Sequence, residues 1–146
     1  MNKYRSHYCN ELRKNSVGNN VTLSGWINKK RDHGNLLFID LRDNYGITQC
    51  IIDKENSNFN KLEKIQLETV IKVEGKVIDR SNETINKEIS TGEIEVIINN
   101  FKVLGSCNEL PLPVFTDQEY AEEIRLKYRF LDLRRKKIHE NIILRS

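Results

Sequence analysis

The chain has 146 residues, of which 38% are hydrophobic and 31% are charged. This length and balance favour one folded domain with an appendage, and they exclude a chain that is disordered throughout. The net charge of +3 is too small to indicate nucleic-acid binding by itself. No apolar stretch has transmembrane length and no signal-peptide segment follows the first residues, so we expect a cytoplasmic protein with no membrane partner.

The sequence shows no catalytic or metal-binding motif. The three cysteines (Cys9, Cys50 and Cys107) are far apart and odd in number. No pair has zinc spacing, and we expect no disulfide framework. The histidines form no metal-ligand pattern, and the common phosphate-loop, dinucleotide and hydrolase motifs are missing. We therefore expect no catalytic residue, no metal site and no cofactor in this chain.

The first half of the chain predicts three strands. A short helix near residues 6–15 and a turn at 17–20 precede the first strand at 21–28. Gly25 inside that strand suggests a bulge or a sharp bend. A turn at 32–35 then leads to a second strand at 36–42, and the loop from Lys29 to Asn35 is expected to separate the two strands.

The Asp-Asn-Tyr-Gly turn at 43–46 leads to a third strand at residues 47–52. Apolar residues at helical spacing next predict a short helix at 57–67. A fourth strand at 69–78, a polar loop from Asp79 to Gly92 and a fifth strand starting at Glu93 and continuing toward Leu104 complete the pattern.

Three strands, a helix and two further strands form the order of the OB-fold, a five-stranded Greek-key barrel. We therefore predict a mostly β protein with helical additions over residues 1–108. This fold binds oligonucleotides on the face of its second and third strands. A barrel used only for protein contacts is the alternative, because a fold does not determine a function.

The remaining residues predict helices. The two prolines in Leu110-Pro111-Leu112-Pro113 indicate a linker at 109–119, and Thr116 to Glu119 has the pattern of a helix capping box. Residues 125–135 are dense in cations, which is typical of a charged helix surface. Ile138, Ile142 and Ile143 predict another helix, and we expect residues 120–146 to form a hinge and the beginning of a domain that lies outside this chain.

Phe38 is predicted to lie on the outer face of the second strand. Strand side chains alternate, so Leu37, Ile39 and Leu41 share the core side, whereas Phe38 lies on the side that carries charges. An exposed aromatic ring beside the basic run Lys29-Lys30-Arg31 is suited to stacking on a nucleobase. The alternative is that Phe38 packs in the core or contacts another domain.

Gln49 is expected to lie beside that ring. If Arg42 pairs with Ile47 across the turn, Asp40 faces Gln49 and Phe38 faces Ile51, which places Gln49 on the Phe38 side. Its amide has donors and an acceptor that suit the edge of a base. The alternative is that Gln49 is simply solvated.

Four stretches of the chain resemble the N-terminal anticodon-binding region of bacterial-type aspartyl-tRNA synthetases. They lie at residues 21–28, 38–43, 91–96 and 125–135. The resemblance implies a class II enzyme that joins aspartate to its tRNA using ATP and magnesium, usually as a homodimer. The class II catalytic motifs are missing from this sequence, so we expect the chain to bind tRNA without aminoacylating it. A stand-alone OB-fold module for single-stranded nucleic acid or protein is the alternative.

The resemblance also implies roles for individual residues. Phe38 stacks on the middle anticodon base, Gln49 hydrogen-bonds that base, and Arg31 matches an arginine that contacts the anticodon loop. Arg80 and Asn86, in the loop after the fourth strand, match positions near the first anticodon base.

Several positions depart from the family pattern. Lys29 and Lys30 replace arginines, which keeps the charge and loses the fork geometry. Thr84 stands where the family often has asparagine.

His33 follows the basic run, in a loop that in the family lies near the third anticodon base. Many members that are selective for aspartate tRNA have leucine here. An imidazole both donates and accepts hydrogen bonds. We therefore hypothesise an enzyme that also charges asparagine tRNA with aspartate, the alternative being a solvent-exposed turn histidine without a role.

Overall fold

The computed structural model describes residues 2–116 and 118–146. It divides into two compact units, Met1–Asn108 and Glu109–Ser146. Each unit is described separately below.

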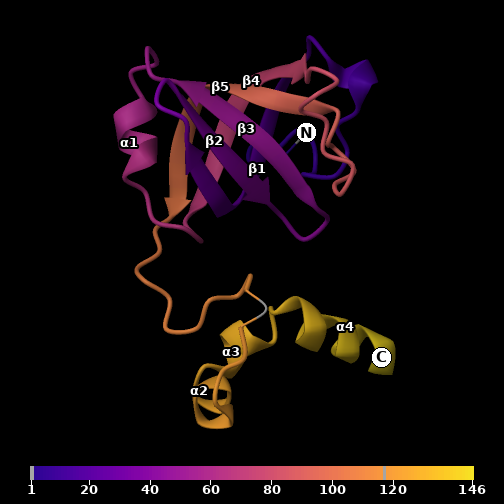
Figure 1. Cartoon of the computed structure of the whole chain (residues 1–146), viewed down its shortest axis with the longest axis vertical. Helices are drawn as coiled ribbons and strands as arrows, with labels where there is room; N and C mark the ends of the chain where they lie inside the picture. Colours follow the sequence, from indigo (N-terminus) through magenta and orange to yellow (C-terminus); the bar gives the residue numbers. More distant parts are fainter. Residues whose placement is uncertain (1, 117) are drawn as a thin grey trace. The chain divides into compact units, whose positions relative to one another are not determined.

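The first unit is a closed five-stranded barrel (Figure 1). Its strands are β1 (Asn20–Asp32), β2 (Leu36–Arg42), β3 (Ile47–Asp53), β4 (Val70–Asp79) and β5 (Ile94–Gly105). The strand order around the barrel is β1-β2-β3-β5-β4. All pairings are antiparallel except the short parallel contact between β3 and β5. The predicted OB-fold is confirmed.

Strand β1 is longer than predicted, and this changes the position of the basic run. The strand continues to Asp32, so Lys29, Lys30 and Arg31 lie in β1 and not in a loop. The bulge lies between Ile27 and Lys29, not at Gly25. Gly25 instead permits a close backbone approach, because a Cβ atom there would collide with the carbonyl oxygen of Arg42.

The predicted helices are shorter in the structure. The helix expected near residues 6–15 is wrong, since only a single 3-10 turn, η1 (Lys14–Ser16), forms there. The segment before it is fixed by contacts with the barrel, as the Cys9 backbone N–H donates to the Asp43 carboxylate (2.9 Å) and Thr48 Oγ1 donates to the Cys9 carbonyl (2.8 Å). Helix α1 (Phe59–Glu63) replaces the longer helix predicted at 57–67.

The barrel interior follows the predicted alternation. Leu37, Ile39 and Leu41 are buried with side chains from every other strand and with Phe59 and Leu62 of α1. Residues Phe38 and Asp40 of the same strand are only partly buried. The outer face of β2 is therefore available for contacts outside the barrel.

The second unit contains α2 (Glu122–Lys127), α3 (Arg129–Asp132) and α4 (Lys136–Arg145). Leu112 and Val114 of the predicted linker pack with Leu131 of α3 in a small cluster. The residue that caps α2 is Ala121, so the expected capping by Thr116 is wrong. Asp117 of that pattern lies outside the described residues. The helix predicted from Ile138, Ile142 and Ile143 is confirmed as α4.

A buried carboxylate connects the helices of this unit. Asp132 is fully buried, and its oxygens accept hydrogen bonds from Arg125 Nε (3.2 Å) and Arg129 Nη1 (2.9 Å), with Arg135 Nη1 at 3.5 Å. Burial raises the pKa of this carboxyl, but the hydrogen bond and charge of Arg125 and the charges of the other two arginines outweigh it and leave the pKa below its ordinary value.

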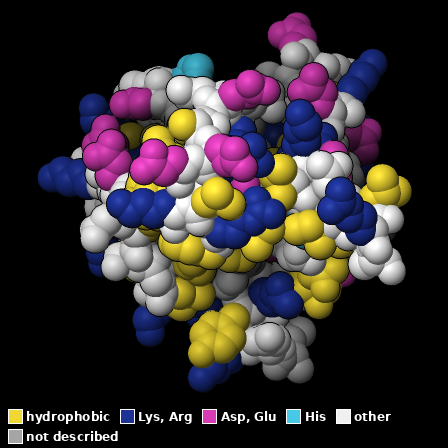
Figure 2. All heavy atoms as spheres, turned by 90° about the horizontal axis from the view of Figure 1, so that it is seen from below, with side chains coloured by type: hydrophobic (Ala, Val, Ile, Leu, Met, Phe, Trp, Pro, Cys, Tyr) yellow, Lys and Arg dark blue, Asp and Glu magenta, His cyan; other side chains and the backbone are white. Residues whose placement is uncertain are grey.

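Large apolar side chains of this unit remain at the surface, among them Leu126, Phe130, Ile143 and Leu144. Figure 2 shows one face of the molecule, on which hydrophobic side chains lie at the surface among Lys and Arg side chains. Within the described residues, no helix is long and apolar enough to span a membrane.

Candidate nucleic-acid interface

An aromatic ring lies on the outer face of β2, in the position that the alternation predicts. Phe38 pairs with Arg31 of β1 on one side and with Ile51 of β3 on the other. The His33 imidazole, in the turn between β1 and β2, stands edge-on to the Phe38 ring, with the ring centroids 5.1 Å apart. Phe38 is only partly buried, so its ring can offer a planar base a stacking surface beside the His33 contact.

The bulge in β1 brings Arg31 to this face. Up to Ile27 the odd-numbered side chains of β1 point into the barrel. The extra residue at Asn28 reverses the alternation, so Lys29 and Arg31 pair with the outward-facing Asp40 and Phe38, and Lys30 pairs with the core residue Ile39. Without the bulge, Arg31 would point toward the interior.

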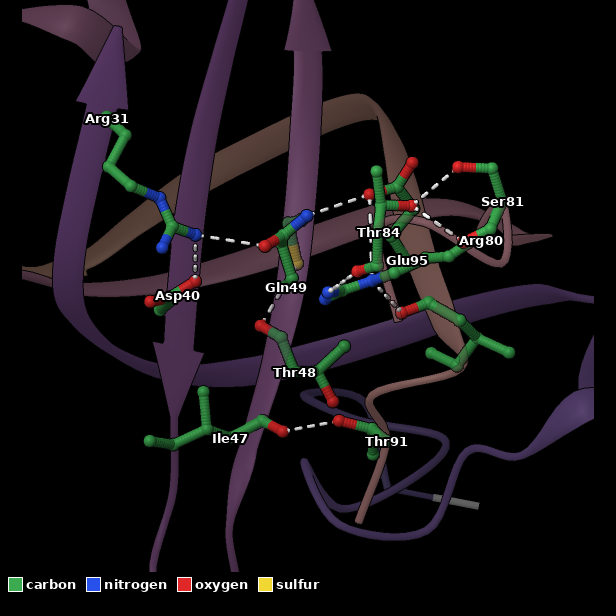
Figure 3. Close-up of polar contacts among 12 residues, drawn as sticks. Arg31, Asp40, Ile47, Thr48, Gln49, Arg80, Ser81, Thr84, Thr91 and Glu95 are labelled. Atoms are coloured by element: carbon green, nitrogen blue, oxygen red, sulfur yellow. Dashed lines mark hydrogen bonds and ion pairs between the residues drawn. The ribbon is translucent and has the colours of Figure 1, made fainter. Parts of the chain in front are cut away.

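Gln49 lies at the centre of a chain of polar side chains on β1, β2, β3 and β5 (Figure 3). Arg31 Nη2 donates to Asp40 Oδ1 (2.8 Å) and to Gln49 Oε1 (2.9 Å). Gln49 Nε2 donates in turn to Glu95 Oε2 (2.8 Å). These partners fix the orientation of the amide, since its oxygen faces an arginine and its nitrogen faces a carboxylate. We call Arg31, Asp40, Gln49 and Glu95 the polar row.

Arg80 adjoins the far end of the polar row. Its Nε lies 3.9 Å from Glu95 Oε2 and donates to the Ile94 carbonyl (3.0 Å), and its Nη1 donates to the Thr84 carbonyl (3.2 Å). Burial lowers the pKa of the guanidinium, while the charge of Glu95 opposes that shift. Among the described residues no group accepts a hydrogen bond from the buried Arg80 Nη2, so one donor beside the polar row is unused.

Asn86 does not join this network through its side chain. Its Oδ1 accepts from the backbone N–H of Glu88 (2.9 Å), and its own N–H donates to the Gly92 carbonyl (3.1 Å). Gly92 is required there, because a Cβ would collide with the Asn86 carbonyl. Asn86 thus shapes the loop between β4 and β5.

The two lysines of the basic run have different surroundings. Lys29 is exposed and lies opposite Asp40 on the outer face. Lys30 instead donates from Nζ to the carbonyl oxygens of Glu63 (2.6 Å), the last residue of α1, and Ile65 (2.5 Å), which follows the helix. Burial lowers the pKa of Lys30, and the charge of Glu63 opposes this. Lys30 therefore does not lie on the outer face with the other residues of the basic run, Lys29 and Arg31.

Glu95 was not singled out from the sequence. Its outward position follows from alternation, since its neighbours Ile94 and Val96 are fully buried. Its distance from Gln49, however, depends on the parallel register between β3 and β5, in which Cys50 pairs with Val96. Within the described residues no group of three or more His, Cys, Asp or Glu side chains is arranged to hold a metal ion.

Residues 21–104 match the family model of the OB-fold nucleic acid binding domain of the tRNA anticodon type. The chain is 77% identical over all of its 146 residues to an aspartate–tRNA(Asp/Asn) ligase of Pelagibacter ubique, and 54% identical over 99% of its length to one of Bradyrhizobium diazoefficiens. It spans about a quarter of the length of these curated relatives, 25% in both cases.

Solved structures give the same picture of the fold. The asparaginyl-tRNA synthetase of Pyrococcus horikoshii superposes with a TM-score of 0.73 at 29% identity, over 88% of this chain and 28% of that one. The aspartyl-tRNA synthetase of Entamoeba histolytica has a TM-score of 0.78 at 18% identity, over 90% of this chain and 33% of that one. At that identity the second similarity concerns the fold alone.

Proposed function

The chain belongs to the family of OB-fold nucleic acid binding domains, and from this premise we propose that it recognises the anticodon of a tRNA as the N-terminal part of an aspartate–tRNA ligase. One observation carries the proposal: a partly exposed aromatic ring lies beside an amide whose orientation is fixed by Arg31 and Glu95. A stacking surface next to an oriented donor and acceptor is suited to a splayed-out RNA base.

Each predicted residue then has a defined task. Phe38 stacks on the middle anticodon base and Gln49 hydrogen-bonds its edge, after exchanging one of its present partners for the base. Lys29 and Arg31 attract the phosphates on the β1 side. Arg80 Nη2 has no acceptor among the described residues but is buried, so it can donate to a neighbouring base only after the loop between β4 and β5 opens, and Asn86 holds that loop in shape.

We assign Lys30 a structural role in place of its predicted RNA contact. Both of its bonds end on backbone carbonyls near α1, and it pairs with a core residue. Cations are favourable at helix C-termini, where carbonyl groups lack partners.

The activity of the longer protein is part of the same proposal. The longer protein joins aspartate to tRNA using ATP and Mg²⁺, as a homodimer in the cytoplasm. Residues 1–108 form its anticodon-binding domain, 109–119 its linker, and 120–146 its hinge and the beginning of the catalytic domain. The support is the match of this whole chain to ligases that are about four times as long.

We further propose that the longer protein also charges asparagine tRNA with aspartate. Two observations support this. The two relatives described above carry the name aspartate–tRNA(Asp/Asn) ligase, and the residue where selective members of the family have leucine is His33, whose ring lies against Phe38. An imidazole can hydrogen-bond either of the two pyrimidines that distinguish the anticodons.

The test is a binding titration with RNA stem-loops. The chain should bind a stem-loop with the aspartate anticodon more tightly than one with a changed middle base. Equal affinity for both would favour the alternative, a stand-alone OB-fold module, in its form that binds single-stranded nucleic acid. No binding to either would contradict the proposed function and favour a module that binds protein. A pyrophosphate-exchange assay with aspartate and ATP should show no turnover by this chain and clear turnover by the longer protein.

A further inference from the structure

The side chain of Asn28, the extra residue of β1, is held by the neighbouring strand. Its Oδ1 accepts a hydrogen bond from Arg42 Nη1 at the end of β2 (2.6 Å). The same guanidinium donates twice to the Glu68 carboxylate, from Nη1 to Oε1 (3.1 Å) and from Nη2 to Oε2 (3.2 Å). We call Asn28, Arg42 and Glu68 the bulge lock, because they meet where β1 gains one residue over β2.

The bulge lock is shielded from solvent. The side chains of Arg42 and Glu68 are each only 9% exposed, and the ring of Trp26 lies 5.5 Å from the Arg42 guanidinium. A two-point bond between a guanidinium and a carboxylate is more directional than a single ion pair. Removing one partner would leave the other charge buried and uncompensated. The position of the guanidinium beside Asn28 is therefore tightly defined.

The backbone of Glu68 holds the same part of β1 from the opposite side. The Glu68 N–H donates to the Ile27 carbonyl (2.8 Å), and the Ile27 N–H donates to the Thr69 carbonyl (3.0 Å). Glu68 has a φ of 66°, a left-handed conformation that residues with a Cβ rarely adopt. The residue before the bulge is thus fixed through its backbone, and Asn28 is fixed through its side chain.

The bulge decides which cation lies beside the stacking ring. Continued without an extra residue after Ile27, the pairing would place Lys30 beside Phe38 and Arg31 beside the core residue Leu37, whereas Arg31 pairs with Phe38 in the structure. An unpaired arginine in the apolar interior is strongly unfavourable. Loss of the bulge lock should therefore free the end of β1 and not shift its register.

We propose that Arg42 and Glu68 are positioning residues for RNA recognition, which act through Asn28 to hold Arg31 on the outer face. The inference rests on the proposed function and extends it to residues outside the polar row. A buried ion pair that only stabilises the barrel would need no contact with the bulge. Here the guanidinium also bonds the one inserted residue that sets the face of Arg31.

The first measurement is the backbone order of residues 29–32 in the free chain. Asn28→Ala removes the acceptor of the Arg42 bond, and the NMR order parameters of these amides should fall below about 0.6, the range of flexible backbone. Glu74→Gln is the matched control. It removes an ion pair with Lys72 (2.7 Å) on the outer face of β4, and it should leave residues 29–32 ordered.

An exchange of the two acceptors provides the conservative rescue. The double variant Asn28→Asp, Glu68→Gln keeps one carboxylate and one amide beside Arg42 and leaves the total charge unchanged. It should retain the order that Asn28→Ala loses. Thermal melting of each variant separates local mobility of β1 from unfolding of the barrel.

The second measurement is a mutant cycle with the stem-loop that carries the aspartate anticodon. Asn28→Ala should weaken binding about tenfold, the scale of a lost charge-assisted contact. In a chain that already carries Lys29→Ala and Arg31→Ala, the same substitution should change binding by less than about twofold, because the cations that it positions are missing. A general loss of stability would act by the same factor in both chains.

The outcomes separate the inference from the proposed function. If residues 29–32 stay ordered in Asn28→Ala, or if this substitution weakens binding by the same factor with and without the two cations, the bulge lock does not position Arg31 for RNA. If Phe38→Ala and Arg31→Ala both leave binding unchanged, the proposed interface itself is wrong, whatever the order of β1.

Discussion

The imidazole of His33 meets the phenyl ring of Phe38 edge-on, with an angle of 79° between the ring planes. One ring comes from the turn after β1 and the other from the middle of the outer face of β2. A base that stacks on Phe38 therefore lies within reach of the residue that we propose selects the neighbouring base. We therefore expect stacking and selection to be coupled through this contact.

The first prediction concerns this pair. The unsubstituted chain should bind stem-loops with the aspartate and the asparagine anticodon with similar affinity. His33→Leu should favour the aspartate stem-loop about tenfold, a difference of about 1.4 kcal/mol, because it restores the leucine of those family members that are selective for aspartate tRNA. Fluorescence anisotropy with both RNAs measures the ratio. His139→Leu on α4 is the control, and an unchanged ratio in His33→Leu would show that selection lies elsewhere.

The second prediction concerns stacking. Phe38→Ala should weaken stem-loop binding by about 1–3 kcal/mol, the scale of one lost base stack, while the melting temperature changes little. Phe101→Ala should do the opposite, since Phe101 belongs to the interior cluster and its loss costs about 3–5 kcal/mol of folding free energy. Unfolding of Phe38→Ala at room temperature would mean that the ring is needed for the core.

The third prediction concerns the middle base. Gln49→Ala should reduce the preference for the cognate middle base by about 1–3 kcal/mol, the range of a good base contact. It should weaken binding of a stem-loop with the wrong middle base much less. The exposed Gln66 gives a matched control in Gln66→Ala. Equal losses on both RNAs would show that Gln49 supports the network without contacting the base.

The fourth prediction separates the two lysines. Lys29→Ala should weaken binding of all stem-loops alike and lower the salt slope by about 1, with unchanged folding stability. Lys30→Ala should leave the salt slope unchanged and destabilise the barrel by about 1–3 kcal/mol, because two charge-assisted hydrogen bonds to carbonyl groups are lost. Salt titrations and urea unfolding of both variants decide the question. A normal salt slope in Lys29→Ala would remove that residue from the interface.

The fifth prediction concerns pH. The pKa of Asp132 is lowered in the folded state, so its contribution to stability is present above its unfolded pKa of about 3.9 and is lost as the pH falls through the lower folded pKa. The amide resonances of α3 should therefore be constant from neutral pH to about pH 4 and change below it. Asp132→Asn should show the loosened state already at neutral pH. An α3 that is equally ordered in this variant would mean that the three arginines do not depend on the carboxylate.

The period-two alternation was sufficient to predict the barrel and the face of Phe38. From Leu36 to Leu41 the residues of β2 alternate between partly buried and buried by parity, and only Arg42 departs from this pattern because it is buried. The turn at Asp43 fixes the register with β3, as the pairs Phe38–Ile51 and Asp40–Gln49 confirm. The end of β1 could not be predicted in this way. Its last residues are held by backbone hydrogen bonds to β2, which leave no apolar pattern in the sequence.

The position of Lys30 was hidden for a related reason. A bulge at Asn28 reverses the inward and outward alternation of every later residue in β1. No side-chain pattern in the sequence indicates this bulge. Glu95 was missed because its approach to Gln49 depends on the closure of the barrel, a contact between strands that are more than forty residues apart in sequence.

The closed chain of partners around Gln49 has a consequence for the accuracy of recognition. In the free protein, the amide oxygen and nitrogen of Gln49 already bond to Arg31 and Glu95. If Gln49 reads a base as proposed, the base must replace one of these partners, so we expect its hydrogen bond to add less net affinity than a bond to an unpaired group would. When a wrong base is present, the Gln49 amide keeps its hydrogen bonds to Arg31 and Glu95 and is not left without partners. We therefore expect milder rejection here than in a site with unpaired donors and acceptors, so that high fidelity would require several bases to be recognised together.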